Sequence, residues 1–232
     1  MKLKDIIDFI DGKIPEDLAL DFDNVGIMGK YDLNRDMKSI KIFMDLLPED
    51  DGFSEDTLII THHPPLFEPK TPTYTIHSNW DIIDGGANDA LAKSLGLEVI
   101  DYYDDKTKIG RICESKYNFK ELKEHILEKF DNVRTVNKLS DKEMIGKIAI
   151  ISGFGLKKSE YVQLAHDKQI DILVSGDLSQ ETAILAKNLG VTLIDLGHHE
   201  SEIPGLYALK ELLDELGMNI EVIDKKPIEM LM

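Results

Sequence analysis

The chain alternates short apolar runs with amphipathic segments, and this alternation limits its fold more than any other feature of the sequence. In the second half we expect strands at residues 147–152, 170–174 and 191–195, and helices at 159–169, 180–189 and 204–216. Earlier residues predict helices at 2–11, 88–95 and 119–130, and strands at 39–47, 57–61 and 97–100. Strands separated by helices of this length favour an α/β fold with mixed, largely parallel sheets.

The length of 232 residues suits one large domain or two modest α/β lobes. Residues 91–101 and 185–195 share Leu-Ala-Lys, Leu-Gly and Ile-Asp at matching positions, as two related lobes would. A helix–glycine–strand unit also arises by chance, so this repeat supports duplication only weakly. We place the first lobe at 1–108, completed by part of 206–232, and the second at 109–205.

The composition excludes several functional classes. With 27 basic against 44 acidic residues the net charge is −17, which opposes direct binding to nucleic acids. No apolar run approaches the roughly 20 residues that span a bilayer, and the N-terminus lacks the pattern of a signal peptide. The single cysteine, Cys113, rules out an intramolecular disulfide. We therefore expect a cytoplasmic protein without membrane contact.

Four of the seven histidines form two pairs, and each pair follows a predicted strand. After the strand at 57–61 the chain reads His62-His63-Pro64-Pro65. Side chains that are adjacent on a regular strand point to opposite faces, but Pro64 prevents a normal continuation. The backbone can then turn so that both imidazoles reach one cleft or flank two ions. Open α/β sheets bind their ligands at this end of the strands.

The second pair begins the segment His198-His199-Glu200-Ser201-Glu202. His198 and Glu202 are four residues apart, so in a helix they share one face. An imidazole and a carboxylate are suitable ligands for Zn, Mn, Fe or Co, and the carboxylate can bridge two ions. His199 and Glu200 then point elsewhere and become candidates for orienting the ligands or for acid–base chemistry.

A third segment contains His77 and Asp81. Asp81 offers an oxygen ligand that can bridge, and His77 lies one helical turn earlier, where it can orient Asp81 or contact a substrate. We interpret His125 and His166, which lie in charged helices, as structural. Placement and spacing predict that five residues gather around one or two divalent cations: His62, His63, Asp81, His198 and Glu202.

Several turns are weaker candidates. Residues 152–155 and 175–177 follow strands and contain glycines, so they can present backbone N–H groups to a phosphate, although neither has a Walker lysine. We interpret both as candidate walls of a substrate site. The turn at 23–26 is either a ligand-facing turn or a plain one. Cys113 has no paired cysteine and is expected to be structural.

These motifs occur in the order found in a known family. The chain resembles the Nif-three-like proteins, also called GTP cyclohydrolase 1 type 2 homologues or dinuclear metal centre hexameric proteins, over nearly its whole length. The resemblance rests most strongly on Thr61-His62-His63-Pro64-Pro65 and on Gly197-His198-His199-Glu200-Ser201-Glu202. Softer matches lie at 23–26, 77–81, 86–89 and 175–177. The chain is similar to the compact form of the family, which lacks a large inserted domain.

The resemblance implies two similar, intertwined α/β lobes with a dinuclear site between them, in a toroidal homohexamer. It implies the same five metal ligands, with Asp81 and Glu202 as the bridges. Two parts of the chain depart from the family pattern. Residues 102–146 match no family motif, and Ser179-Gln180 stands where some relatives carry histidine, which puts the substrate contacts there in doubt.

The function implied is that of a metal-dependent hydrolase acting on a nucleotide or a related small heterocycle, with GTP as the candidate substrate. Hydrolysis of GTP would open the imidazole ring of the purine, and His77 and His199 are the candidate proton shuttles. The alternative is a ring-shaped regulatory or protein-interaction module whose metals are structural. A metal chaperone or store is a third candidate.

Overall fold

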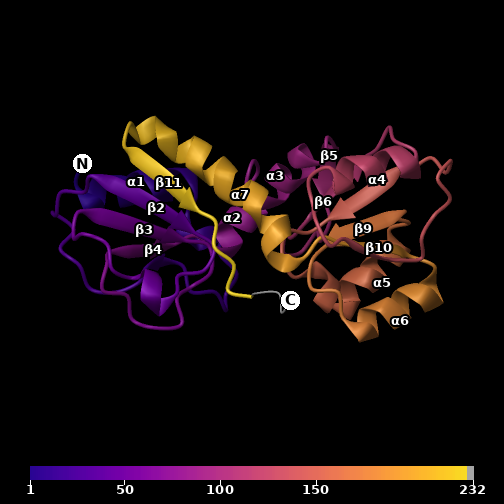
Figure 1. Cartoon of the computed structure of the whole chain (residues 1–232), viewed down its shortest axis with the longest axis horizontal. Coiled ribbons are helices and arrows are strands. Elements are labelled where there is room, and N and C mark those ends of the chain that lie inside the picture. The colour runs from indigo at the N-terminus through magenta and orange to yellow at the C-terminus, as the bar shows by residue number, and fades with distance from the viewer. Residues whose placement is uncertain (229–232) are drawn as a thin grey trace. The chain divides into compact units, whose positions relative to one another are not determined.

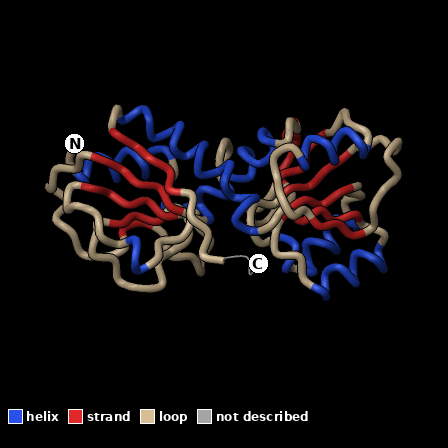
Figure 2. Tube along the Cα trace, viewed as in Figure 1, coloured by secondary structure: helices blue, strands red, loops and turns tan. Residues whose placement is uncertain are grey.

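The computed structural model describes residues 1–228, which divide into two compact units (Figure 1). Unit 1 contains Met1–Gly86 and the C-terminal segment from Gly205, and unit 2 contains Ala87–Pro204. The chain therefore leaves unit 1 and later returns to it, and the return falls inside helix α7 (His198–Leu213). Each unit combines helices with a mixed sheet (Figure 2), which confirms the expected α/β class.

Among the described residues, the sheet of unit 1 has five strands. In spatial order they are β1 (Gly26–Ile27), β4 (Thr73–Thr75), β3 (Thr57–Thr61), β2 (Ser39–Phe43) and β11 (Asn219–Ile223). All neighbouring pairs are parallel except β1 with β4. All five residues of β3 are buried, as expected for a central strand that is covered on both faces.

The helices of unit 1 are α1 (Leu3–Lys13), α2 (Ser78–Ile82) and the later part of α7. Short 3₁₀ turns lie at Glu16–Leu18, Pro48–Asp50 and Asp214–Leu216. In α1 the residues Leu3, Ile6 and Ile10 recur at helical spacing and are buried. The helix lies within the predicted range, 2–11, apart from its last two residues.

The sheet of unit 2 has six strands within the described part of the chain. In spatial order they are β5 (Glu98–Tyr102), β6 (Arg111–Glu114), β8 (Lys147–Ile150), β9 (Ile172–Ser175), β10 (Thr192–Asp195) and β7 (Arg134–Val136). The central strands β8, β9 and β10 are parallel, and the others join antiparallel.

Helices cover both faces of this sheet. Those of unit 2 are α3 (Ala87–Ser94), α4 (Phe119–Leu127), α5 (Ser159–Asp167) and α6 (Gln180–Leu189), with a 3₁₀ turn at Gly155–Lys157. α3 and α4 share one apolar core with the strands through residues such as Leu91, Leu122 and Ile148. α5 and α6 pack on the opposite face, against β9 and β10 (Figure 1). Asn118 and Glu121 form a capping box that fixes the start of α4.

The boundary between the units differs from the expected one. Residues 87–108, which we expected in the first lobe, lie in unit 2 because β5 pairs with β6 there. Both copies of the repeated pattern, 91–101 and 185–195, therefore belong to unit 2 and do not relate the two units. The C-terminal segment joins unit 1 as expected, through the pairing of β11 with β2.

The last helix begins earlier than predicted. We expected it to start at Pro204, since proline favours the first turn of a helix. α7 instead begins at His198, so Pro204 lies inside it. Ser201 compensates for part of the cost, because its hydroxyl donates to the His198 carbonyl at 2.8 Å and accepts from the Gly153 N–H at 2.8 Å. These bonds hold the segment before the proline in its helical turn.

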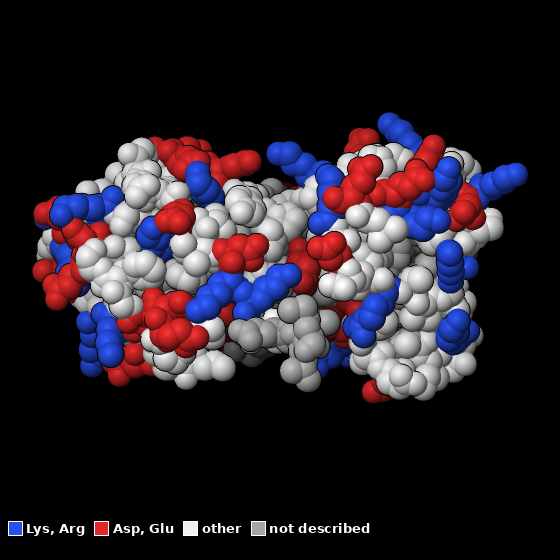
Figure 3. All heavy atoms as spheres, viewed as in Figure 1, with Lys and Arg blue, Asp and Glu red and all other residues white. Residues whose placement is uncertain are grey.

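No helix of the described residues is long and apolar enough to cross a membrane. On the face drawn in Figure 3, acidic and basic side chains are interspersed.

Cys113 reports on the integrity of unit 2. Its side chain is fully buried on β6, and burial, reinforced by the charge of Asp89, raises the pKa of the thiol to about 12. At pH 8 only about one thiol in 10⁴ is then ionised, and the thiolate is the reactive form. We expect iodoacetamide to leave the native protein unmodified over hours and to label it within minutes in denaturant, followed by mass spectrometry. Rapid labelling of the native protein would show that unit 2 opens around β6.

Candidate metal centre

Three neighbouring parallel strands of unit 1 end at one level of the sheet. The ladder pairs Phe43 of β2 with Thr61 of β3, and Thr61 with Thr75 of β4. Two residues beyond these aligned positions the three strands present, in turn, Asp45, His63 and His77. His62 lies one residue beyond Thr61. Strand order and register alone therefore bring these side chains to one edge of unit 1.

The three histidines of this edge form a cluster. The ring centroids of His62 and His63 are 5.0 Å apart, and His77 lies 5.1 Å from the first and 5.3 Å from the second. One ring nitrogen from each lies within 4.8 Å of the other two. Three imidazoles at such distances can bind a common cation.

Each of these histidines has its Nδ1 atom engaged by an oxygen. Nδ1 of His62 lies 3.1 Å from the backbone carbonyl of Ile76. The Nδ1 atoms of His63 and His77 each lie 2.8 Å from a carboxylate oxygen, belonging to Asp45 and Asp23 respectively. Because these oxygens accept, Nδ1 carries the proton in each neutral ring, and Nε2 carries the lone pair. This is the arrangement found around histidines that ligate metals.

Asp81 completes the group in unit 1. It lies on α2, and its Oδ1 atom is 3.6 Å from Nε2 of His62. Both side chains are buried, His62 with 2% and Asp81 with 7% of its surface exposed. The indole of Trp80 fixes α2 by donating to the carbonyl of Gly205 at 3.1 Å. An imidazole and a carboxylate buried side by side are costly to desolvate, and a shared cation would offset that cost.

Asp23 anchors His77 through both of its oxygens. Oδ1 accepts from the His77 ring, and Oδ2 accepts from the backbone N–H of Ser78 at 3.0 Å. Burial raises the pKa of Asp23, but the hydrogen bonds from His77 and Ser78 outweigh it and bring the pKa well below its usual value. The turn at 23–26, which from sequence was either a plain or a ligand-facing turn, thus holds a candidate site residue.

The second candidate group lies in unit 2, at the start of α7. His198 and Glu202 share one helix face, and Nε2 of His198 is 3.2 Å from Oε1 of Glu202. Nδ1 of His198 lies 2.9 Å from Oδ2 of Asp177, which follows β9. His198 and Glu202 were expected to share one face if their segment formed a helix, and it does.

Two carboxylates, one at each ring nitrogen, surround His198. Burial lowers the pKa of His198, but the contacts with Asp177 and Glu202 outweigh it and raise the pKa to about 10. The hydrogen bond with His198 also lowers the pKa of Asp177. The surroundings of Nε2 thus favour a positive charge, which either a proton or a metal ion can supply.

Three glycines pack this end of unit 2 tightly. A Cβ atom on Gly153 would overlap the carboxylate of Glu202, and one on Gly176 would lie 2.6 Å from the backbone of Gly197. The N–H of Gly153 donates to Ser201, and that of Gly155 to Ser175 at 2.9 Å.

The N–H of Gly176 donates to the carbonyl of Gly153 at 2.8 Å. The N–H groups of Gly153, Gly155 and Gly176 are thus all engaged within unit 2 and are not available to a phosphate. That these turns form walls of a substrate site stays a prediction. The turns let the loops after β8, β9 and β10 approach closely around Glu202.

The predicted residues thus fall into one group per unit. His62, His63, His77 and Asp81 lie together in unit 1, and His198 and Glu202 lie together in unit 2. His199 is in the first turn of α7, half-buried, with its Nδ1 atom inside the protein.

The sequence did not predict that Asp45 and Asp177 contact the rings of His63 and His198. Asp45 lies two residues after the end of β2, and His63 lies two residues after the end of β3. This match predicts their contact only when β2 and β3 are known to be neighbours.

The donor set fits a first-row divalent cation. Histidine nitrogens and carboxylate oxygens suit Zn, Mn, Fe or Co, and the engaged Nδ1 atoms fix which nitrogen faces the cation. Each unit contributes such donors, so each contains candidate metal ligands.

Gly153 should be essential for the position of Glu202. We expect Gly153→Ala to lower the free energy of unfolding by about 1–3 kcal/mol more than Gly190→Ala, because the added methyl group meets a carboxylate that is only 3% exposed. The control shares the positive φ angle, 73° against 80°, but has open space around it. Denaturant unfolding of both variants measures the difference, and equal losses would contradict the packing described for Glu202.

The chain matches a known family model and named relatives over most of its length. Residues 1–73 and 70–227 match the family model described as Duf34/NIF3 (NGG1p interacting factor 3). A GTP cyclohydrolase 1 type 2 homolog from Methanothermobacter thermautotrophicus is 37% identical over 97% of this chain and 93% of its own length. A second GTP cyclohydrolase 1 type 2 homolog, from Methanocaldococcus jannaschii, is 31% identical over 96% of this chain and 98% of its own length.

Among solved structures, reduced HcgD from Methanocaldococcus jannaschii superposes with a TM-score of 0.83 at 30% identity, covering 97% of this chain and 98% of that one. The match of the family model along nearly the whole chain, together with these relatives, shows that the chain belongs to the Duf34/NIF3 family.

Proposed function

We propose that the protein is a divalent-metal-dependent hydrolase with a dinuclear site, similar to GTP cyclohydrolase 1 type 2, acting on a nucleotide or a related small heterocycle. The observation that carries the proposal is the histidine cluster of unit 1, in which every Nδ1 atom is engaged by an oxygen acceptor. Such an arrangement orients Nε2 for a metal and is more than the packing of a core requires. The names of the relatives support the reaction class.

The proposed ligands are His62, His63, Asp81, His198 and Glu202, with Asp81 and Glu202 as bridges between two cations of Zn, Mn, Fe or Co. That they serve one dinuclear centre rests on the motifs shared with the family. Bound cations would supply Lewis acidity, making a water more acidic and polarising the group that is attacked.

The chain's own residues orient this chemistry. Asp45 holds His63, and Asp177 holds His198, each through Nδ1, so that the rings keep one orientation. His77 and His199 are the proposed proton shuttles, because an imidazole exchanges protons near neutral pH. Asp23 would keep the proton of His77 on Nδ1, which leaves Nε2 to accept a proton from a substrate or water.

His77 can serve instead as a nitrogen ligand, since it lies as close to His62 as His63 does. The two roles predict different phenotypes. A ligand variant loses the metal, whereas a proton-shuttle variant keeps the metal and loses turnover.

The second candidate function is a metal-stabilised regulatory or protein-interaction module without catalysis. The description of the matched family, which names an interacting factor, favours it.

Our proposal for this protein also includes a homohexameric ring, which follows from the family resemblance. It further includes a cytoplasmic location, which suits the single buried Cys113.

The hydrolase proposal predicts release of formate from GTP by protein loaded with Mn, Zn or Fe. His198→Ala should abolish release while the oligomeric state is unchanged, and His77→Asn should reduce release by about 10²-fold or more with the metal content retained. Formate is measured enzymatically, metal by elemental analysis and assembly by light scattering. If GTP and a panel of other nucleotides and heterocycles all stay intact, and His198→Ala disrupts assembly, the structural alternative is correct.

Asp177 should set the affinity for metal in unit 2. We expect Asp177→Asn to weaken metal binding by about 10–100-fold, because the amide no longer fixes the ring of His198 or its protonation. Competition with a chelator measures the dissociation constant. Asp131→Asn, which removes an exposed charge from the same unit, is the control and should bind metal like the parent protein. Equal affinities of the two variants would remove Asp177 from the metal site.

A further inference from the structure

Unit 2 contains a small cavity whose lining includes none of the candidate metal ligands. It lies between α4 and the paired strands β7 and β10, with Ile194 of β10 and Phe119 and Ile126 of α4 among its walls. Leu127 and Val133 continue the apolar lining toward the surface. Most of these residues belong to 102–146, the segment that matched no motif of the family. Figure 1 shows α4 above this part of the sheet.

The cavity has a volume of about 170 Å³. An apolar cavity of about 150 Å³ is large enough to bind benzene. Phe119 and Ile126 are almost fully buried and Ile194 is 4% exposed, so the side chains of the inner wall are apolar and belong to the core of unit 2. Leu127 is 57% exposed, which leaves the cavity accessible from one side. An apolar group of about benzene size therefore fits it.

The polar groups of the lining are cationic apart from one hydroxyl. Lys123 and Lys138 both contribute to it, together with Thr135. The hydroxyl of Thr135 donates to the Leu193 carbonyl at 2.9 Å. The Lys123 ammonium pairs with Asp141 at 2.9 Å, and the exposed Lys138 also acts on the Asp141 carboxylate through its charge. Two ammonium groups against one carboxylate give this opening a local positive charge in a chain whose net charge is −17.

We propose that this cavity is a binding site for a small monocarboxylate that carries an apolar group of about benzene size. The apolar group fills the space against Ile194 and Ile126, and the carboxylate meets Lys138 at the opening. Burial of the apolar group supplies most of the affinity, and the ammonium supplies the preference for an anion. The site is independent of the proposed metal chemistry, since none of its lining residues is a proposed ligand.

Phenylacetate is the probe that tests the site, with benzyl alcohol and phenethylamine as neutral and cationic controls. Titration of the full-length protein, followed by methyl NMR of Ile126 and Ile194, should give saturable shifts with a dissociation constant of about 1 mM. The two controls should bind at least about fivefold more weakly, since they lack the charge that pairs with Lys138.

Two variants assign the binding to this cavity. Lys138→Glu should weaken phenylacetate binding by about fivefold or more, while Lys187→Glu, an equal charge change on α6 at the other face of the sheet, should leave it unchanged. Val133→Phe should fill the opening and abolish binding, with the fold checked by its unperturbed amide spectrum. Absence of shifts at both isoleucines overturns the proposal, as does equal binding of the three probes. If an acidic peptide that contains phenylalanine binds and phenylacetate does not, the cavity belongs to a protein partner and the proposal is overturned.

Discussion

The candidate site depends on the register of three parallel strands. Phe43, Thr61 and Thr75 are aligned across β2, β3 and β4, and the ladder continues past them, with the N–H of His62 donating to the Phe43 carbonyl at 2.9 Å. A shift of one residue in any of these strands would move its side chains to the opposite face of the sheet. The positions of the histidines are therefore set by hydrogen bonds of the backbone and by the fully buried strand β3, before any metal binds.

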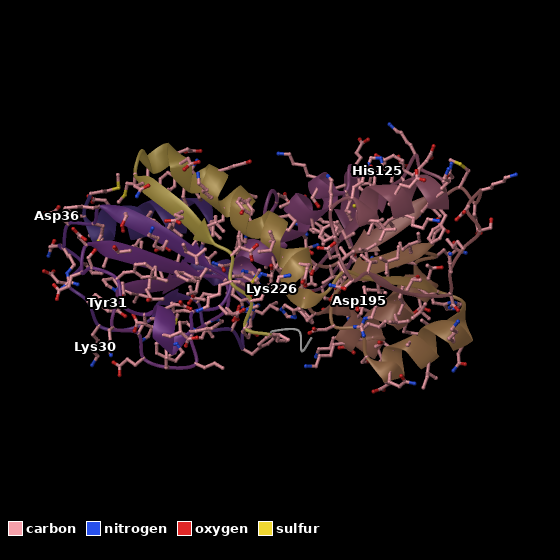
Figure 4. The ribbon with its side chains drawn as sticks, in the orientation of Figure 1. Lys30, Tyr31, Asp36, His125, Asp195 and Lys226 are labelled. Carbon is pink, nitrogen blue, oxygen red and sulfur yellow. The ribbon has the colours of Figure 1, made fainter. Side chains whose placement is uncertain are left out.

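In unit 2 the candidate ligands are positioned by close packing of loops. Ile150, Val174 and Ile194 are aligned across β8, β9 and β10, and the loops that follow meet at Gly153, Gly176 and Gly197. Asp195, labelled in Figure 4, ends β10 and supports the turn. Its carboxylate accepts from the N–H of Gly197 at 3.1 Å and pairs with Arg134 of the edge strand β7. Asp177, which follows β9, thus fixes the ring of His198, and Asp195 fixes the backbone turn before it.

The sequence predicted the histidines more reliably than their partners. His62 and His63 end an apolar run at a proline, and His198 and Glu202 have helical spacing, so both patterns are local. Asp45 and Asp177 become informative only through strand order, which depends on contacts between residues distant in the chain.

The start of α7 was misjudged for a related reason. Pro204 is a strong local signal, but Ser201 holds the helical turn ahead of it by donating to the His198 carbonyl and accepting from the distant Gly153 N–H. The position of β5 could not be predicted either, because its pairing with β6 was not visible in the pattern of residues 102–146.

The acidic partners also make the orientation of the rings resistant to pH. The pKa values of Asp23 and Asp177 are lowered in the folded protein, so both carboxylates stay ionised well below neutral pH. A group with a lowered pKa stabilises the fold above its unfolded value and loses this contribution only as the pH falls through its folded value. Both carboxylates therefore remain hydrogen-bond acceptors for the Nδ1 atoms of His77 and His198 across the neutral range.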